Sequence, residues 1–364
     1  METLDTYLGL KEIHLVWKIL CIAPWARSKK YYYTWMSFIF CFNIFFVSRT
    51  IVDYLLCEDS KCVLNHVLYY VAGWSKVSQY LLMFLCRRKL LQLENLFHML
   101  DGNVTLLEDQ VVVRKAIQTG RRILKYFLIL ATFYISGRML GFILTSGEIP
   151  IVPLWSPFDG QLVIKFLYDS IVIYLLALQA IVSDMFSPAC FPLLNAHFKI
   201  LSQQLLRIGV GEESNIRRLI ERHIIILRIY KILEETLSKV FFVELLVASI
   251  QLCILITSVI SADMEFSELI FAITFIFALM FQLFPVCVLA DHFQTLSEKF
   301  ADAAYATNWV DQDRAFRSAI LLIIHRAQNC SLILAGGIVP INLRTFLSIF
   351  RYAYSFSAIY SMVY

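Results

Sequence analysis

The sequence predicts an all-α membrane protein with seven transmembrane helices, a cytoplasmic N-terminus, an extracellular C-terminus and a cytosolic helical anchor layer. The first observation is compositional: 59% of the 364 residues are hydrophobic and 16% are charged, against about 45–50% and about 25% in soluble domains. The second is a series of long apolar stretches, and the third is an alternation of basic residues between them. The formal net charge of only +4 gives no indication of a nucleic-acid partner, and we expect none.

Seven apolar stretches are long enough, at a helical rise of ~1.5 Å per residue, to cross a bilayer core of about 30 Å. They cover residues 33–56, 63–85, 124–146, 161–185, 240–260, 268–289 and 341–364. Basic residues collect before the first stretch and after the second, fourth and sixth, whereas the third and fifth connections contain no Lys or Arg. Because Lys and Arg are retained on the cytoplasmic side, this alternation predicts the orientation. It is opposite to that of a G-protein-coupled receptor.

The fourth and sixth connections show helical periodicity. In residues 214–239 the apolar positions are Ile216, Leu219, Ile220, His223, Ile224, Leu227, Tyr230 and Leu233. A helix starting near Asp311 carries a second stripe of Phe316, Ile320, Ile323 and Ile324. A helix with one apolar stripe needs a partner, so we predict a packed cytosolic layer; the alternative is helices lying on the inner leaflet. Gly336, Gly337 and Pro340 are expected to separate this layer from the last span, with Pro340 as its first residue.

The last span is unusually polar for a lipid anchor. It contains two arginines and several hydroxyl groups, at Arg344, Arg351, Tyr352, Tyr354, Ser355, Ser357, Tyr360 and Ser361. Such groups are unfavourable in lipid, so this helix should face protein or water. The alternative is an interfacial belt of tyrosines with arginines that reach the headgroups.

The C-terminal part of the chain resembles the insect odorant receptors. The resemblance is carried by Ala304, Tyr305, Trp309, Arg317, Leu321, Arg326, Thr345, Phe346, Ser348, Ile349, Arg351, Ala353, Tyr354 and Ser355. The length and the inverted seven-helix topology are consistent with this family along the whole chain. The gustatory receptors are the closest alternative, but their terminal Thr-Tyr and Gln-Phe motif is not present.

The resemblance implies an odorant-gated, non-selective cation channel of four subunits in the plasma membrane of sensory neuron dendrites. The final helix of each subunit would line a central pore, and cytosolic helices would form the intersubunit contacts. An odorant-specific subunit would assemble with co-receptor subunits, and the moderate length of residues 186–239 is typical of the odorant-specific type. Alignment from the C-terminus places the pore gate on Ile359 and Val363.

These expectations divide the chain into four parts. Residues 1–32 form a cytoplasmic segment, 33–290 a six-helix ligand-binding region with cytosolic extensions, 291–338 the anchor helices, and 339–364 the pore-lining helix. An aromatic cluster with facing glycines lies toward the extracellular ends of the second, third, fourth and sixth spans, where the resemblance implies the odorant pocket. Its members are Tyr69, Tyr70, Gly73, Trp74, Ser136, Gly137, Leu140, Gly141, Phe166, Tyr168, Ile171, Phe271 and Thr274.

Such a cluster suits a small volatile ligand, aromatic or apolar, because burial and ring stacking need few polar contacts. The alternative is ordinary helix packing. The proline-rich third connection, residues 147–158, is expected to roof the cavity.

Two pairs of residues are candidates for specific bonds. Arg138 and Asp169 each lie eight residues from the outer end of a span, about 12 Å deep, so we predict that they pair with each other. The alternative is that Arg138 meets a carbonyl and Asp169 meets Lys165. Cys57 and Cys62 lie in the first outer connection and form a disulfide or remain two thiols.

The sequence gives no indication of an enzyme. The spans contain no hydrolytic dyad, and the nine cysteines show no CxxC or Cys/His spacing, so we expect no catalytic residues, metal or cofactor. A secondary transporter is the competing class, although the chain has no detectable repeat or paired broken helices.

Overall fold

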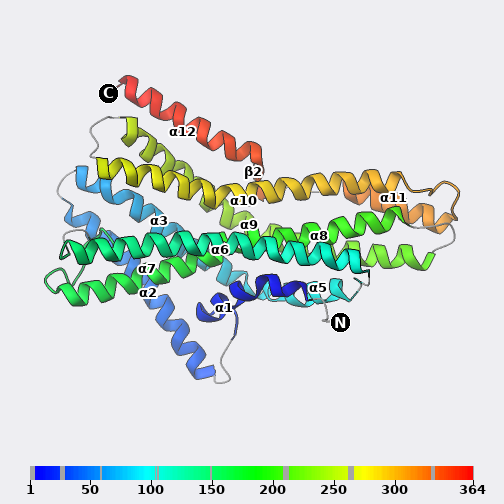
Figure 1. Cartoon of the computed structure of the whole chain (residues 1–364), viewed down its shortest axis with the longest axis horizontal. Helices are drawn as coiled ribbons and strands as arrows, with labels where there is room; N and C mark the ends of the chain where they lie inside the picture. Colours follow the sequence, from blue (N-terminus) through cyan, green and yellow to red (C-terminus); the bar gives the residue numbers. More distant parts are fainter. Residues whose placement is uncertain are drawn as a thin grey trace.

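The computed structural model describes residues 5–24, 29–57, 60–102, 104, 106–147, 150–207, 213–260, 266–328 and 333–363. These residues are helical apart from loops and one two-stranded hairpin. The elements are η1 (Thr6–Leu10), α1 (Lys11–Ile19), α2 (Lys29–Leu56), α3 (Ser60–Leu85), α4 (Arg87–Leu90), α5 (Gln92–Asp101), α6 (Leu107–Leu144), α7 (Leu162–Asp184), α8 (Phe186–Leu206), α9 (Glu213–Ile260), α10 (Phe266–Tyr305), α11 (Arg314–Gln328), β1 (Leu334–Ala335), β2 (Val339–Pro340) and α12 (Leu343–Val363). Figure 1 shows α6 and α10 running along the long axis of the molecule.

Each predicted span coincides with a helix. Five helical stretches within the described residues are long and apolar enough to cross a membrane: Lys29–Leu56, Leu107–Leu144, Leu162–Leu206, Ile216–Val259 and Ala272–Tyr305. The other two predicted spans correspond to α3, of 26 residues, and α12, of 21 residues.

Helix α9 differs from the prediction because it is one continuous helix of 48 residues. Residues 213–260 contain neither Gly nor Pro, so nothing interrupts the backbone between the predicted cytosolic helix and the predicted span. Most of the predicted stripe is buried, but Ile224 is 56% exposed, whereas Arg222 is buried. The prediction for Ile224 was therefore wrong: the buried face turns to include Arg222 and Ile226 instead.

The centre of the packed core is α8, which is buried along most of its length and contacts α6, α9 and α10. Its aromatic residues Phe186, Phe191 and Phe198 have no exposed surface. Trp17 of α1 lies against Phe186, with ring centroids 5.2 Å apart. The apolar stripe predicted on α11 is also buried, since Phe316, Ile320 and Ile323 are at most 3% exposed. These helices therefore pack on one another.

A hairpin connects this core to α12. Gly336 and Gly337 form its turn with φ of 61° and 75°, values that strongly favour glycine. The prediction that Pro340 begins the last helix was wrong: Pro340 lies in β2, and α12 begins at Leu343. The side chain of Asn342 caps α12, accepting a hydrogen bond of 2.9 Å from the Thr345 amide. Helix α12 then packs on α9 and α10 (Figure 1).

Candidate functional site

A cavity of about 320 Å³ lies between α3, α6, α7, α9 and α10, and we call it the central cavity. Each helix lines it with residues spaced by three or four positions. Examples are Ala72, Lys76 and Gln79 on α3, Leu176, Ala180 and Asp184 on α7, Glu244, Ala248 and Gln251 on α9, and Phe275, Leu279 and Gln282 on α10. This spacing keeps side chains on one helical face. The cavity is therefore built from one stripe of each helix.

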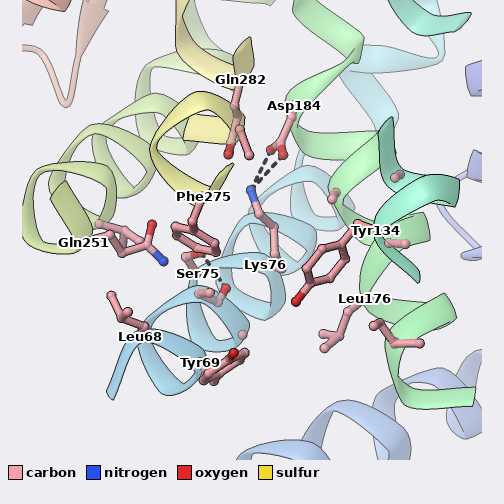
Figure 2. Close-up of a pocket in the computed structure, with 18 of the residues that line it drawn as sticks. Leu68, Tyr69, Ser75, Lys76, Tyr134, Leu176, Asp184, Gln251, Phe275 and Gln282 are labelled. Atoms are coloured by element: carbon pink, nitrogen blue, oxygen red, sulfur yellow. Dashed lines mark hydrogen bonds and ion pairs between the residues drawn. The ribbon is translucent and has the colours of Figure 1, made fainter. Parts of the chain in front are cut away.

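Most of the cavity wall is apolar or aromatic. Tyr69, Tyr134, Leu176 and Phe275 surround it in Figure 2. Phe46 of α2 also reaches the wall, because Gly73 leaves space for its ring: a Cβ atom at Gly73 would lie 2.4 Å from the ring of Phe46. Such a wall suits a small apolar or aromatic molecule.

One part of the wall is polar (Figure 2). Lys76 Nζ donates hydrogen bonds to Asp184 Oδ1 at 2.7 Å and to Asp184 Oδ2 at 2.9 Å. It also donates to Gln79 Oε1 at 3.0 Å. Ser183 also donates to Asp184 Oδ1 at 2.6 Å. Glu244 completes this part of the wall and is 3% exposed. Among the described residues, neither oxygen of Glu244 nor Nε2 of Gln79 makes a hydrogen bond.

The segment Ile151–Leu154 covers the central cavity and carries four of its lining residues. Arg49 holds this roof by donating to the carbonyls of Leu154 at 2.9 Å and Trp155 at 2.5 Å. A carboxylate oxygen of Asp53 accepts from the Trp155 amide. Arg138 donates to the carbonyl of Ile151 at 3.0 Å and to that of Pro150. The proline-rich connection thus covers the cavity, as predicted.

The predicted pair of Arg138 and Asp169 is not formed. Asp169 pairs with Arg49 at 3.0 Å, and neither side chain has exposed surface. Arg138 instead bonds the backbone of the roof, which is the alternative considered for it, while Lys165 pairs with Asp159. The depth argument identified Asp169 as a charge that needs a partner, but helical depth alone does not tell which neighbouring helix supplies it.

Of the predicted ligand-binding residues, Tyr69 and Gly73 line the central cavity. Tyr70 donates to Asp53, and Trp74 donates to Thr50 at 2.7 Å. Phe166 packs on Phe142, and Tyr168 lies under the guanidinium of Arg49. Five other predicted members lie at exposed positions: Ser136, Gly137, Leu140, Ile171 and Thr274. The side chain of Phe271 lies outside the described residues.

The predicted residues are neighbours in the sequence, which lie on different faces of a helix, and aromatic content was the signal for them. The polar residues of the wall were therefore not predicted: Lys76, Asp184, Glu244, Gln251 and Gln282. Polar side chains at helical spacing within apolar spans were the signal that could have found them.

Three other predicted residues are only partly described. Cys57 is held in a disulfide bond, but the side chain of Cys62 lies outside the described residues, so the pairing stays a prediction. Ile359 is 63% exposed on α12, and the side chain of Val363 is also outside the described residues. On the opposite side of α12, Ser357 is buried and lies 3.1 Å from Thr257 of α9, oxygen to oxygen.

Asp53, Cys57 and His66 bring their ligand atoms within 4.8 Å of one another, as do Asp5, His98 and Asp101. The sulfur of Cys57 is in a disulfide and is no thiolate ligand. Asp53 is occupied by bonds from His66, Tyr70 and the Trp155 amide. The first group is thus better explained as support for the roof than as a metal site.

Residues 63–354 match the family described as 7tm Odorant receptor. Among characterised proteins, the chain is 27% identical to Odorant receptor 33a of Drosophila melanogaster over 278 residues, covering 72% of this chain and 73% of that one. It is 22% identical to Odorant receptor 85a of the same species over 350 residues, covering 90% and 86%.

Among solved structures, the fold is similar to that of the insect olfactory receptor OR5 from Machilis hrabei, with a TM-score of 0.84, 19% identity and coverage of 99% and 100%. A structure of the same receptor in complex with eugenol gives a TM-score of 0.83 at 17% identity, with coverage of 99% and 100%.

Proposed function

The chain belongs to the insect odorant receptor family, and we propose that it is the odorant-specific subunit of a ligand-gated cation channel. Membership decides between the odorant and gustatory alternatives, and it agrees with the prediction of a non-enzymatic, multi-pass membrane protein. The observation that carries the proposal is the central cavity, a roofed and mainly apolar space in a fold shared with a receptor solved in complex with eugenol. A small volatile molecule would bind there.

The channel would contain four subunits in the plasma membrane, with co-receptor subunits beside this chain. Its N-terminus would be cytoplasmic and its C-terminus extracellular, as the basic residues predict. Helix α12 supports a pore-lining role. Ala353 and Ser357 are buried on α9 and α10, whereas Tyr352, Tyr354 and Ile359 are more than 60% exposed. That exposed face is available to a pore or to a neighbouring subunit.

The ligand would act on the pore through α9. This helix contributes Glu244, Ala248 and Gln251 to the cavity wall, and about two turns further on Thr257 contacts Ser357 of α12. A ligand that displaces the stripe on α9 would therefore move a helix in direct contact with α12. Ile359 and Val363 would form an apolar constriction that opens when the four α12 helices separate.

Current recording tests the proposal in cells that express this chain alone, the co-receptor alone, or both, during application of a panel of volatile compounds. We expect ligand-evoked cation current when both are present. The variant Ala248→Phe fills the cavity and should abolish the response at normal surface level. Ile250→Phe is the matched control, because Ile250 is on the same helix but 41% exposed. Equal responses in both variants, or no current with any volatile, would contradict the proposal.

A further inference from the structure

The central cavity contains more acidic groups than basic ones. Its lining residues include two carboxylates, Asp184 and Glu244, and one ammonium group, Lys76. All three side chains come from helices predicted to span the membrane. An uncompensated charge in such a place costs several kcal/mol or more, so the arrangement of these groups demands an explanation.

The N–H donors of Lys76 are all occupied by its existing hydrogen-bond partners. An ammonium group has three N–H donors, and those of Lys76 serve the two oxygens of Asp184 and the Oε1 atom of Gln79. Asp184 is further compensated by the hydroxyl of Ser183. The hydrogen bonds among Lys76, Asp184 and Gln79 therefore leave no N–H donor of Lys76 for a second carboxylate.

Glu244 is the carboxylate that remains. It is 3% exposed, it lines the cavity, and neither of its oxygens accepts a hydrogen bond from the described residues. Its polar neighbours on the wall include Gln282 and Gln251, whose amide groups can donate hydrogen bonds but carry no charge. Among the described residues, the wall at Glu244 therefore lacks one positive charge, because the donors of Lys76, the cation that lines the cavity, serve Asp184 and Gln79.

We propose that the central cavity binds a small organic amine whose protonated nitrogen pairs with the Glu244 carboxylate. This inference rests on the proposed function and specifies the class of odorant. The ammonium supplies the missing charge and also donates hydrogen bonds to the carboxylate, and the apolar part of the ligand lies among Tyr69, Tyr134 and Phe275. These rings also favour a nearby cation through their π faces. A neutral volatile buries the same apolar surface but leaves the charge of Glu244 uncompensated.

The test compares 2-phenylethylamine, 2-phenylethanol and ethylbenzene, which share a ring and a two-carbon chain and differ in the terminal group. They are applied at neutral external pH to cells that express this chain with the co-receptor. A hydrogen bond to a charged group is worth about 1.5–3 kcal/mol, which corresponds to about 10- to 100-fold in affinity. We expect the amine to activate at concentrations at least about tenfold lower than the alcohol.

The variant Glu244→Gln keeps the shape of the side chain and removes its charge. It should weaken activation by the amine at least about tenfold while leaving the concentration needed for the alcohol nearly unchanged. Glu234→Gln is the matched control, because Glu234 lies on the same helix and outside the cavity lining. Surface biotinylation verifies that each variant reaches the membrane, and the comparison of the three ligands on the unmodified chain does not depend on any variant.

Two results overturn the inference while the proposed function stands: activation by the alcohol or hydrocarbon as readily as by the amine, or an amine response that Glu244→Gln leaves unchanged. The first would show that Glu244 serves a neutral hydroxyl group or the structure alone. Absence of current with all three compounds and with the wider volatile panel, at normal surface level, overturns the proposed function together with the inference.

Discussion

Arg49 and Asp169 show how a membrane helix accommodates a charge at the level of single residues. Both are without exposed surface and 3.0 Å apart, so each offsets the cost of removing the other from water. Arg49 also donates to the roof at Leu154 and Trp155, and its guanidinium lies 5.0 Å from the centre of the Tyr168 ring. One side chain thus joins α2, α7 and the roof of the cavity.

Replacing Asp169 by Asn removes one charge of this pair and leaves Arg49 buried without compensation. The expected loss of stability is about 3–5 kcal/mol, the usual cost of breaking a buried pair. Asp159→Asn is the control, because the side chain of Asp159 is 46% exposed and its pair with Lys165 should contribute about 1 kcal/mol or less. Thermal midpoints of the purified variants in detergent measure both effects, and similar midpoints would argue against an energetic role for the pair.

His223 predicts a pH dependence in the packed helical core, outside the predicted spans. Its ring packs against those of Phe198 and Phe300, and burial, with a smaller effect of Arg326, lowers its pKa to about 4. The unfolded chain therefore binds a proton near pH 6.5, whereas the folded protein binds it near pH 4. Stability should be complete above about pH 6.5 and should fall by up to about 1.4 kcal/mol per unit as the pH decreases toward 4.

The variant His223→Leu should make this decrease shallower. Thermal midpoints between pH 7.5 and 4.5 measure it, and His292→Leu, at an exposed position, serves as the control. Identical pH profiles for the unmodified chain and His223→Leu would contradict the assignment.

At the scale of elements, the spans and the α11 stripe were predictable because apolar runs and helical periodicity are local properties. The continuity of α9 could also have been read from the absence of Gly and Pro in residues 213–260. The partners of buried charged residues could not be predicted from local sequence, because Asp169 pairs with Arg49, which lies 120 positions away in the chain. Tyr69 and Gly73 were placed at the cavity, but its polar residues depend on how five helices rotate against one another.

The hairpin before α12 gives a prediction at this scale. Gly336 and Gly337 both have positive φ, so alanine at either position should cost about 1–2 kcal/mol in backbone strain. A Cβ atom at Gly336 would also lie 2.9 Å from Cγ of Phe242, whereas at Gly337 it meets nothing within 4 Å. Gly336→Ala should therefore lower the thermal midpoint clearly more than Gly337→Ala. The reverse order would show that Gly336 does not lie against Phe242 of α9.

At the scale of the whole molecule, α12 is an element whose outer face is left uncovered in a single chain. Its inner face is buried on α9 and α10, and its outer face carries exposed aromatic residues. The proposed tetramer would bring this face toward the pore axis and neighbouring subunits.

Substituting Ile359→Ser should raise the current without ligand or change ion selectivity, because a polar ring is wetted more easily than an apolar one. The order of odorant potencies should be retained, since Ile359 is not among the residues lining the cavity. Recordings with the co-receptor present measure both, and Leu347→Ser, at another exposed position of α12 nearer its start, is the control. Unchanged basal current and selectivity would place the gate elsewhere, and reordered potencies would place Ile359 in the ligand site.

The way in which single helix faces line the central cavity has a consequence for how such receptors diversify. Each of five helices contributes only one narrow face to the cavity, with residues such as Ala72, Leu176, Ala248 and Leu279. Its other faces contact lipid or the packed core. Substitutions on a stripe can therefore alter the chemistry of the cavity without disturbing the contacts that maintain the fold. New ligand preferences are accessible to evolution in single steps, taken on one helix at a time.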